Sequence, residues 1–270
     1  MTISIAWVRK IKGSEELILV SDSRLSGNAS SWDQCVKLLT LPRSDCAIGF
    51  AGPTDFAYPL MQQLYLSISS YQRSNDRALD LHDLRGHVLK VFNSLQKSIT
   101  FDLEEVEKDL EKTEFIFAGY SWIRKSFSIW RIFYNKGAKS FQYKPATRIG
   151  NFNDIIFAGD WAAKARNKLI SHLQNKYDND LHNVKVEGFD MEPFEIVRDL
   201  LRSSGRNDSI GGAPQIVKVY QHMNCRPIGV YWPTKKAGNA TLQGRVLQNY
   251  EDSDFWFLDP DTLLTNKLGQ

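Results

Sequence analysis

The order of apolar and polar positions predicts that the chain begins with β-strands. In the first fifty residues, apolar side chains alternate with small or polar ones, as at Ile3, Ile5 and Trp7, or form short apolar runs. Both patterns are typical of strands, because successive side chains of a strand point to opposite faces of a sheet. The expected strands lie at residues 3–8, 16–22, 35–40 and 46–51, with a hairpin turn at 12–14 and a polar loop at 26–33.

Helical spacing follows in two places along the chain. Apolar residues three and four positions apart predict one helix that starts at an N-cap, Thr54, and runs to Ile68, and another from about residue 80 to 98. Two more helices are expected at residues 161–176 and 193–203. Further strands are expected at residues 114–120, 126–134, 155–158, 215–221, 227–232 and 241–247.

The resulting order is strands, two helices, strands, two helices and strands. Each helix pair needs a sheet face to cover, and two sheets can also cover each other. A mixed α+β fold with two central sheets and helices outside them is therefore one economical arrangement. The acidic run 102–112 is expected to be a solvated helix face or a loop, and residues 255–260 an irregular tail.

The composition and net charge exclude several classes of protein and partner. Apolar residues make up 42% and charged residues 24% of the 270 residues, which is close to the average for soluble globular proteins and excludes a disordered or collagen-like chain. The formal net charge of +3 gives no concentrated basic face, so no nucleic acid partner is expected. No apolar run reaches the roughly 18 residues that a membrane-spanning helix needs, so no membrane partner is expected either.

The sequence also lacks targeting and cofactor signals. Its first residues contain no basic region followed by a long apolar run, so they do not resemble a signal peptide. The three cysteines, Cys35, Cys46 and Cys225, form neither a CxxC pair nor a zinc-ligand spacing. A reducing, cytoplasmic location is the simplest interpretation. Without a Gly-rich phosphate loop, a GxSxG elbow or an HExxH motif, no cofactor or metal is expected.

Candidate chemistry concentrates at the N-terminus, where Thr2 follows the initiator methionine. Aminopeptidases remove Met1 before a small second residue, which would leave Thr2 with a free amine. A free N-terminal threonine supplies a nucleophile, its Oγ1, and a base, its α-amine, whose reference pKa is about 7.7–8.0. A nearby cation lowers the pKa of both groups, and a carboxylate can orient that cation. Asp22 and Lys37 are the candidates for these roles.

Each of these residues also has an ordinary structural interpretation. Thr2 could start a strand with Met1 retained, Asp22 could cap a strand end, and Lys37 could be a solvated strand lysine. Gly49 and Gly52 could serve only a tight turn. Taken singly, these interpretations are the more common ones. The functional interpretation depends on all of the residues occurring together and in this order.

Four segments of the first 52 residues carry a family resemblance. They read Thr2-Ile-Ser-Ile-Ala6, Val20-Ser-Asp-Ser-Arg24, Val36-Lys37 and Gly49-Phe-Ala-Gly52. Together they resemble the N-terminal third of a proteasome β-type subunit and of the related bacterial subunit that works with an unfolding ATPase. These proteins are N-terminal nucleophile hydrolases. The resemblance implies their fold, a four-layer αββα sandwich of two mostly antiparallel sheets flanked by helices.

The resemblance also implies a role for individual residues. Thr2 would be the nucleophile, Asp22 the orienting carboxylate and Lys37 the electrostatic partner. The backbone N–H of Gly52 would donate to the oxyanion that forms during acyl transfer. Loss of one such donor typically costs about 10²–10³ in rate.

A weaker resemblance continues in two later segments. Residues 155–159 are similar to the family's Gly-rich strand end, but Ala158 stands where the family often has an assisting serine. Residues 207–219 resemble the family's D-x-x-S-G-G turn and the strand after it. Aligned on its two glycines, this segment has Asn207 at the acidic position and Ile210 at the serine. A local shift of the alignment would place Asp208 or Ser209 at one of these two positions instead. The accessory candidates are therefore Asn207, Asp208 and Ser209.

The expected function is threonine-type hydrolysis of peptide or amide bonds after removal of Met1. The expected substrate is a peptide or an unfolded protein, with Ser26 on its main chain and Phe50 lining the first specificity pocket. The resemblance further implies a homo-oligomer, with a ring as the usual form, and an unfolding ATPase as a candidate partner. It covers about residues 2–235, so residues 1–237 are interpreted as the hydrolase domain and residues 238–270 as a C-terminal extension.

Two other functions stay open. A catalytically inactive family member, acting as a structural or interaction subunit, is favoured by Ala158, Asn207 and Ile210, which depart from the family's accessory pattern. The N-terminal set of Thr2 and its two charged partners disfavours it. An amidohydrolase of the same class that acts on small amides would keep the nucleophile, and a substrate profile would separate it from a peptidase.

Overall fold

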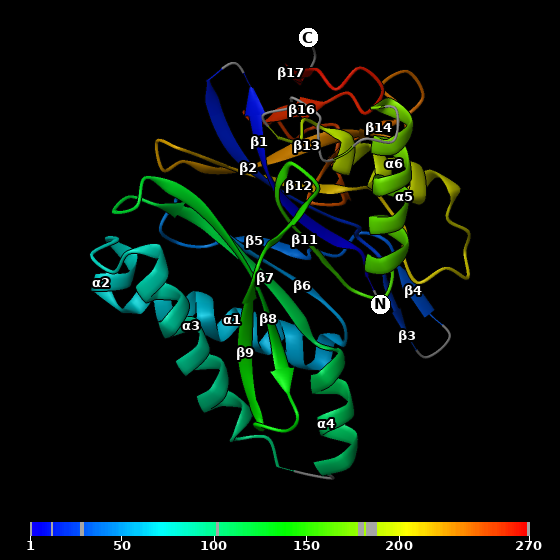
Figure 1. Ribbon diagram of the computed structural model, residues 1–270. Helices are drawn as coiled ribbons and strands as arrows, with labels where there is room; N and C mark the ends of the chain where they lie inside the picture. The colour runs from blue at the N-terminus through cyan, green and yellow to red at the C-terminus, as the bar shows by residue number, and fades with distance from the viewer. Residues whose placement is uncertain are drawn as a thin grey trace.

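The computed structural model describes residues 2–11, 13–27, 30–100, 103–177, 181 and 188–268. It has a mixed α+β fold with mostly antiparallel sheets, which confirms the class expected from the order of elements. Within these residues, the strands form two large sheets and one two-stranded hairpin (Figure 1).

The larger sheet is built around the N-terminal hairpin. β1 (Ser4–Ile11) pairs with β2 (Ser14–Ser21) on one side and with β11 (Phe152–Ala158) on the other. The remaining strands are β10 (Thr147–Ile149), β12 (Gln215–Tyr220), β13 (Cys225–Trp232), β14 (Asn239–Leu242), β15 (Arg245–Val246), β16 (Trp256–Leu258) and β17 (Thr265–Lys267). Their order is β10-β11-β1-β2-β12-β13-β14-β15, with β16 beside β13 and β17 beside β16. The start of β1 therefore lies in the interior of the sheet.

The smaller sheet pairs its strands in chain order. It contains β5 (Leu38–Thr40), β6 (Cys46–Ala51), β7 (Glu114–Ser121), β8 (Ser126–Asn135) and β9 (Ser140–Pro145). All four of its strand pairs are antiparallel. Between the two sheets in sequence, β3 (Leu25–Gly27) and β4 (Ser30–Trp32) form the separate hairpin.

Helices cover the outer face of each sheet. The helices on the smaller sheet are α1 (Thr54–Ser70), α3 (Leu81–Gln96) and α4 (Leu103–Lys112), with the short α2 (Gln72–Asn75) after α1. Those on the larger sheet are α5 (Ala162–Lys176) and α6 (Glu192–Ser203). Figure 1 shows the two groups on opposite sides of the molecule. Apolar periodicity explains their burial: in α1, Leu60, Leu64 and Ile68 recur every four residues and all are buried.

A third apolar cluster lies between the two sheets. Its members come from β1, β2, β11 and β12 of the larger sheet and from β5, β6, β7 and β8 of the smaller one. Five of them are alanines: Ala6, Ala47, Ala51, Ala118 and Ala158. Because side chains this small occupy little space, the sheets can pack closely here, and strand ends from both sheets lie near one another.

Some local expectations at the N-terminal side are wrong. Thr54 is not the N-cap of α1, because Pro53 occupies that position and no side chain caps the first turn. Residues 35–37 are not part of β5, because the N–H of Cys35 donates to the carbonyl of Ser23 and the N–H of Lys37 to the side chain of Gln215 instead of to a neighbouring strand of the sheet. The segment expected as a polar loop contains the β3–β4 hairpin.

Other differences concern short or exposed strands. The pattern missed β9 and β10, in which most side chains are exposed or half-buried, so that no regular alternation marks them. The expected irregular tail contains β16, which pairs in parallel with β13 at Gly229↔Phe257.

The acidic run forms α4, one of its two expected forms. Four strands after residue 238 join the larger sheet, and the interpretation of 238–270 as an extension stays a prediction. None of the described helices is long and apolar enough to cross a membrane.

A buried ion pair fastens the turn between β5 and β6. The side chains of Arg43 and Asp45 are both 0% exposed, and the guanidinium donates to the two carboxylate oxygens at 2.7 and 2.8 Å. Arg43 also donates to the carbonyls of Ser74 and Leu79, each at 2.9 Å. One side chain thus holds the β5–β6 turn against α2 and the segment before α3.

We expect Arg43→Met to destabilise the protein by about 3–5 kcal/mol, because Asp45 would keep a buried charge without its partner. Urea unfolding followed by circular dichroism measures the difference. The matched control is Arg245→Met, which removes a bidentate pair with Glu251 whose side chains are 46% and 28% exposed. Solvent screens that pair, so its loss should matter much less. Equal effects of the two substitutions would contradict the prediction.

Candidate active site

Thr2 lies immediately before β1 and is almost completely buried, at 1% exposure. The strands on both sides of β1 fix its position. The carbonyl of the next residue, Ile3, accepts hydrogen bonds from the N–H of Asp22 at 3.2 Å and the hydroxyl of Ser21 at 3.0 Å. The carbonyl of Thr2 accepts one from the N–H of Trp161 at 3.5 Å.

Lys37 connects the hydroxyl of Thr2 to the carboxylate of Asp22. Its Nζ lies 2.7 Å from Thr2 Oγ1 and 2.8 Å from Asp22 Oδ1. The three residues come from three places in the chain: just before β1, just after β2 and the segment before β5. The structure thus brings together the hydroxyl, the cation and the carboxylate that the sequence nominated.

Burial controls the charge state of this cluster. The side chains of Lys37 and Asp22 are both 0% exposed. Burial lowers the pKa of Lys37 and raises the pKa of Asp22, while the attraction between the two groups opposes both shifts. A lysine with a lowered pKa becomes neutral closer to neutral pH, and a neutral amine can accept the proton of a hydroxyl that it contacts.

Backbone N–H groups hold the carboxylate of Asp22 in place. Ile3 N donates to Oδ1 at 3.2 Å, and Arg24 N and Gly211 N donate to Oδ2 at 3.1 and 3.2 Å. Together with Lys37, these donors reach both oxygens, which offsets part of the cost of burying the charge. The carboxylate therefore has a fixed orientation toward the lysine.

Gln215 is a buried polar residue that sequence reasoning missed. Its Oε1 accepts hydrogen bonds from the N–H groups of Lys37 at 2.9 Å and Leu38 at 3.3 Å. Its Nε2 donates to the carbonyls of Asp22 at 3.1 Å and Cys35 at 2.7 Å. One amide thus ties β12 to the chain around both charged residues of the cluster and fixes their separation.

A second carboxylate, also missed, contacts the nitrogen of Thr2. Asp160, in the turn between β11 and α5, accepts a hydrogen bond from Thr2 N at 2.6 Å on Oδ1 and one from Ser209 Oγ at 2.5 Å on Oδ2. The indole N–H of Trp161 donates to Ser209 Oγ at 2.9 Å. Once the Thr2 nitrogen is a free amine, Asp160 is the group placed to bind it.

One glycine allows the backbone to approach Thr2, and a second allows a turn to pack against the end of α4. Gly159 has φ +96°, and a Cβ there would stand 2.0 Å from the carbonyl oxygen of Thr2 and 3.3 Å from the Cβ of Ala51. Gly52 has φ +114°, and a Cβ there would stand 2.2 Å from the carbonyl oxygen of Lys112. Both positions therefore require glycine. Since Gly159 lies against both Thr2 and Ala51, the turn that carries Gly52 is near Thr2, and its oxyanion role stays a prediction.

The structure does not support every expected contact. Phe50 is 0% exposed and packs edge-on against Tyr58 at 5.1 Å in the core under α1, so it does not line a substrate pocket in this conformation. Ser26 is exposed, in β3. Of the three accessory candidates, Ser209 reaches the cluster, Asn207 is exposed, and the carboxylate of Asp208 instead accepts the N–H of Gly205 at 2.7 Å.

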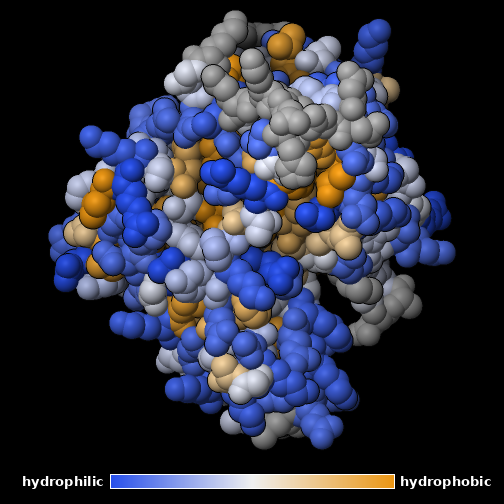
Figure 2. Space-filling model, in the orientation of Figure 1, coloured by the Kyte–Doolittle hydropathy of each residue, from blue (hydrophilic) through white to orange (hydrophobic). Residues whose placement is uncertain are grey.

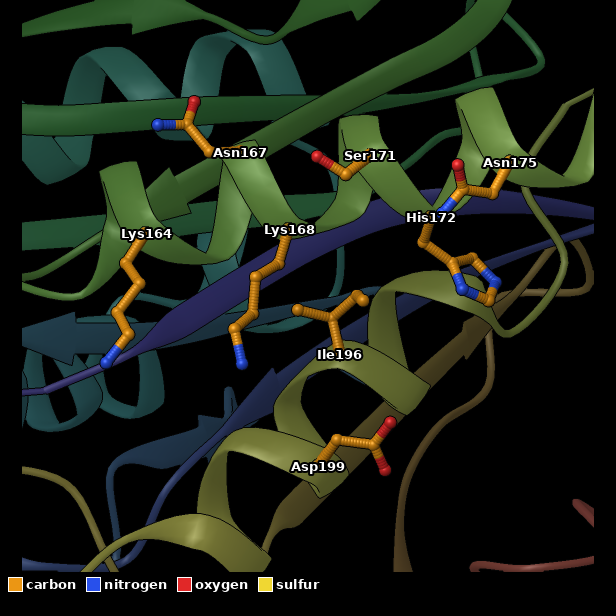
Figure 3. Close-up of a pocket in the computed structure, with 8 residues that line it drawn as sticks. All are labelled: Lys164, Asn167, Lys168, Ser171, His172, Asn175, Ile196 and Asp199. Atoms are coloured by element: carbon orange, nitrogen blue, oxygen red, sulfur yellow. The ribbon is translucent and has the colours of Figure 1, made fainter. Parts of the chain in front are cut away.

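A groove on the described surface lies away from this cluster. It has a volume of about 640 Å³ and runs between α5 and α6 (Figure 3). Lys164, Asn167, Lys168, Ser171, His172, Asn175, Ile196 and Asp199 line it, and none of them touches the Thr2 cluster in any contact described above. The described residues contain no group of His, Cys, Asp and Glu side chains arranged to hold a metal ion.

Comparison of the chain with protein-family models and with curated proteins finds no match in either set.

Proposed function

We propose that this protein is a threonine-type N-terminal nucleophile hydrolase that cleaves peptide or amide bonds after Met1 has been removed. The observation that carries the proposal is the contact of Thr2 Oγ1 with Lys37 Nζ at 2.7 Å, within a cluster that also holds Asp22 at 2.8 Å from the same nitrogen. A nucleophile beside a base that a third group orients is the arrangement that acyl transfer requires.

The first half of the reaction forms an ester. Neutral Lys37 accepts the proton of Oγ1 as Oγ1 bonds to the substrate carbonyl carbon. The N–H of Gly52 donates to the oxygen on which negative charge develops. When the carbon–nitrogen bond breaks, the α-ammonium of Thr2, held by Asp160, gives its proton to the leaving amine. The products of this half are an acyl ester on Oγ1, a protonated Lys37, a neutral α-amine and the free amine.

The second half consumes water and restores the site. The α-amine of Thr2 accepts a proton from water as the oxygen of that water bonds to the ester carbon. Lys37 returns its proton to Oγ1 as the ester bond breaks and the acid leaves. In this mechanism the amine of Thr2 acts twice, first as acid and then as base, and the 2.7 Å contact between Lys37 Nζ and Thr2 Oγ1 supports activation of the hydroxyl by Lys37.

The fold proposed with this function is the four-layer αββα sandwich of N-terminal nucleophile hydrolases. An apolar cluster between two antiparallel sheets and helices on both outer faces support it. So does the interior position of β1, which begins two residues after the proposed nucleophile.

A catalytically inactive relative is the competing proposal, and one observation favours it. Thr2 is 1% exposed, so a substrate carbonyl needs some local opening before it can reach Oγ1. The small-amide alternative uses the same cluster and differs only in the substrate that the opened site admits.

The proposed partners follow from the same family resemblance. They are a peptide or unfolded-protein substrate, further copies of the chain in a ring, and an unfolding ATPase in the cytoplasm. Figure 2 shows a largely hydrophilic face with apolar residues in separate areas. Exposed side chains that could serve subunit contacts include Trp32, Trp122, Tyr250 and Leu264.

Two measurements test the function together. Intact mass of the protein from its own host shows whether Met1 is removed. A peptide epoxyketone, which needs both the hydroxyl and the amine of an N-terminal threonine to close a ring, should then label Thr2 and stop cleavage of a fluorogenic peptide. Retention of Met1 on all molecules, or loss of Met1 without labelling or cleavage, would favour the inactive relative. Cleavage of small amides but not peptides would favour the third function.

A further inference from the structure

Arg24 follows the catalytic carboxylate by two residues and is almost fully buried, at 7% exposure. Its Nη1 lies within hydrogen-bond distance of four carbonyls of the segment before β12, those of Gly205 at 2.7 Å, Asp208 at 3.1 Å, Ile210 at 3.2 Å and Arg206 at 3.5 Å. Four acceptors from a single loop around one nitrogen fix the path of that loop. We call residues 205–210 the accessory loop.

The other side of the guanidinium is also fixed. Nε and Nη2 of Arg24 donate to the two carboxylate oxygens of Asp33, at 2.6 and 2.8 Å. The packing around the group is tight, because a Cβ on Gly211 would stand 2.3 Å from the guanidinium carbon. The planar fork is therefore held between Asp33 and the accessory loop. An ammonium cannot reproduce this bidentate geometry.

The accessory loop leads directly to both carboxylates of the candidate active site. Ser209, within the loop, donates to Asp160, which accepts the N–H of Thr2. Gly211, just after the loop, donates its N–H to Asp22. A shift of the loop would therefore move the partner of Asp160 and one donor of Asp22 together.

We propose that Arg24 is a positioning residue of the Thr2 site, acting through the accessory loop to hold Ser209 and Asp160 against the Thr2 nitrogen. The proposal rests on the proposed function, because that nitrogen matters only when it is a free amine. Arg24 itself touches neither Thr2 nor a reacting atom in the contacts described. Its effect on the reaction is through geometry and through the charge that Asp160 presents to the amine.

The test compares Arg24→Lys with Arg43→Lys. The two arginines form a matched pair, since each is buried, makes a bidentate contact with an aspartate and donates to backbone carbonyls. Arg43, however, lies between β5 and β6 and braces loops of the other helical layer. Both variants are made with Thr2 at the N-terminus by cleavage of a removable fusion, so that the amine is free. The readouts are kcat and KM for a fluorogenic peptide, the melting temperature, and the pKa of the Thr2 α-amine followed by NMR in protein labelled with ¹⁵N-threonine.

For Arg24→Lys we expect kcat to fall about 10- to 100-fold with little change in KM, because misplaced catalytic groups cost rate rather than binding. The described charged groups near the amine are Asp160 on its nitrogen, Lys37 and Asp22 in the hydroxyl cluster, and Glu114, which accepts the N–H of Gly159 beside Thr2. Loss of the Asp160 contact should lower the pKa of the amine by about one unit, because a nearby carboxylate favours the charged form. Arg43→Lys should lower the melting temperature and leave both other readouts as in the unaltered chain.

Unchanged kcat and amine pKa in Arg24→Lys, with only a lower melting temperature, would overturn the proposal. Should that variant fail to fold, Asp33→Asn replaces it. Asp33 is 43% exposed, and its substitution leaves Arg24 in place without its bidentate partner. In Asp33→Asn, kcat and the pKa of the Thr2 α-amine must then both fall, as expected for Arg24→Lys. If the unaltered chain hydrolyses nothing, the proposed function fails, whereas the NMR titration still decides whether Arg24 acts on the Thr2 nitrogen.

Discussion

Thr2→Ala is expected to reduce amide-bond hydrolysis by at least about 10⁴-fold, because it removes the only atom that the mechanism gives to the acyl ester. The fold should be retained, since alanine fits the same position and the backbone contacts of Thr2 do not involve its hydroxyl. Initial rates with a fluorogenic peptide, at protein concentrations high enough to detect the residual rate, measure the effect.

The control is Thr2→Ser, which keeps the hydroxyl and the amine and should keep most of the activity. Melting temperatures of both variants show whether the fold is intact. Full activity in Thr2→Ala would place the nucleophile elsewhere and remove the basis of the proposed mechanism.

Lys37→Met is expected to have the second largest effect, a loss of about 10²–10⁴ in kcat, because the hydroxyl loses the base that contacts it. The substitution should also destabilise the protein by about 3–5 kcal/mol, since Asp22 would be left as a buried charge without its cation. A low rate alone would therefore not separate a chemical role from a structural one.

The double variant Asp22→Asn with Lys37→Met makes that separation. It removes both charges while leaving similar volumes, so urea unfolding should show much of the lost stability restored. The rate should stay low, because no amine faces Oγ1. Recovery of activity together with stability would contradict the assignment of Lys37 as the base.

The pH dependence gives an independent check on Lys37. Its neutral form accepts the proton, so the rate should rise with pH as the lysine loses its proton and fall on acidification. Since burial lowers the pKa of Lys37, this rise should occur below the pH at which a solvated lysine titrates. This rise of the rate with pH should be absent from the residual activity of the Lys37→Met variant.

The strands and helices that the sequence predicted well are the long apolar ones. β6, β7 and β8 and the helices α1, α3, α5 and α6 lie within a few residues of their expected positions, because a continuous apolar stripe marks each of them. β9, β10 and β16 are short or largely exposed, and neighbouring strands hold them in place. Their own residues carry no comparable signal.

The residues of the candidate site also fall into those that the sequence predicted and those that it did not. Thr2, Asp22 and Lys37 lie in one stretch of sequence whose order resembles a known family, and the structure brings them into contact. Asp160 and Gln215 contribute as much to the geometry, but 158 residues separate Asp160 from Thr2 and 178 separate Gln215 from Lys37. A single polar residue at a strand end looks the same in sequence whether or not it reaches such a site. A carboxylate directly after a strand-end glycine, as in Gly159-Asp160, is the one local sign that was present.

The interior position of β1 also affects how the protein should be produced. Ser4 pairs with Ser21 on one side and with Ala158 on the other, so the chain enters the sheet between two occupied neighbours. Any peptide fused before Thr2 would be attached to the nitrogen that contacts Asp160, beside the proposed nucleophile. A purification tag belongs after β17, which pairs only with β16 at the border of the described sheet. Under the proposed function, preparations with an N-terminal tag would lack the free amine of Thr2 and should be inactive.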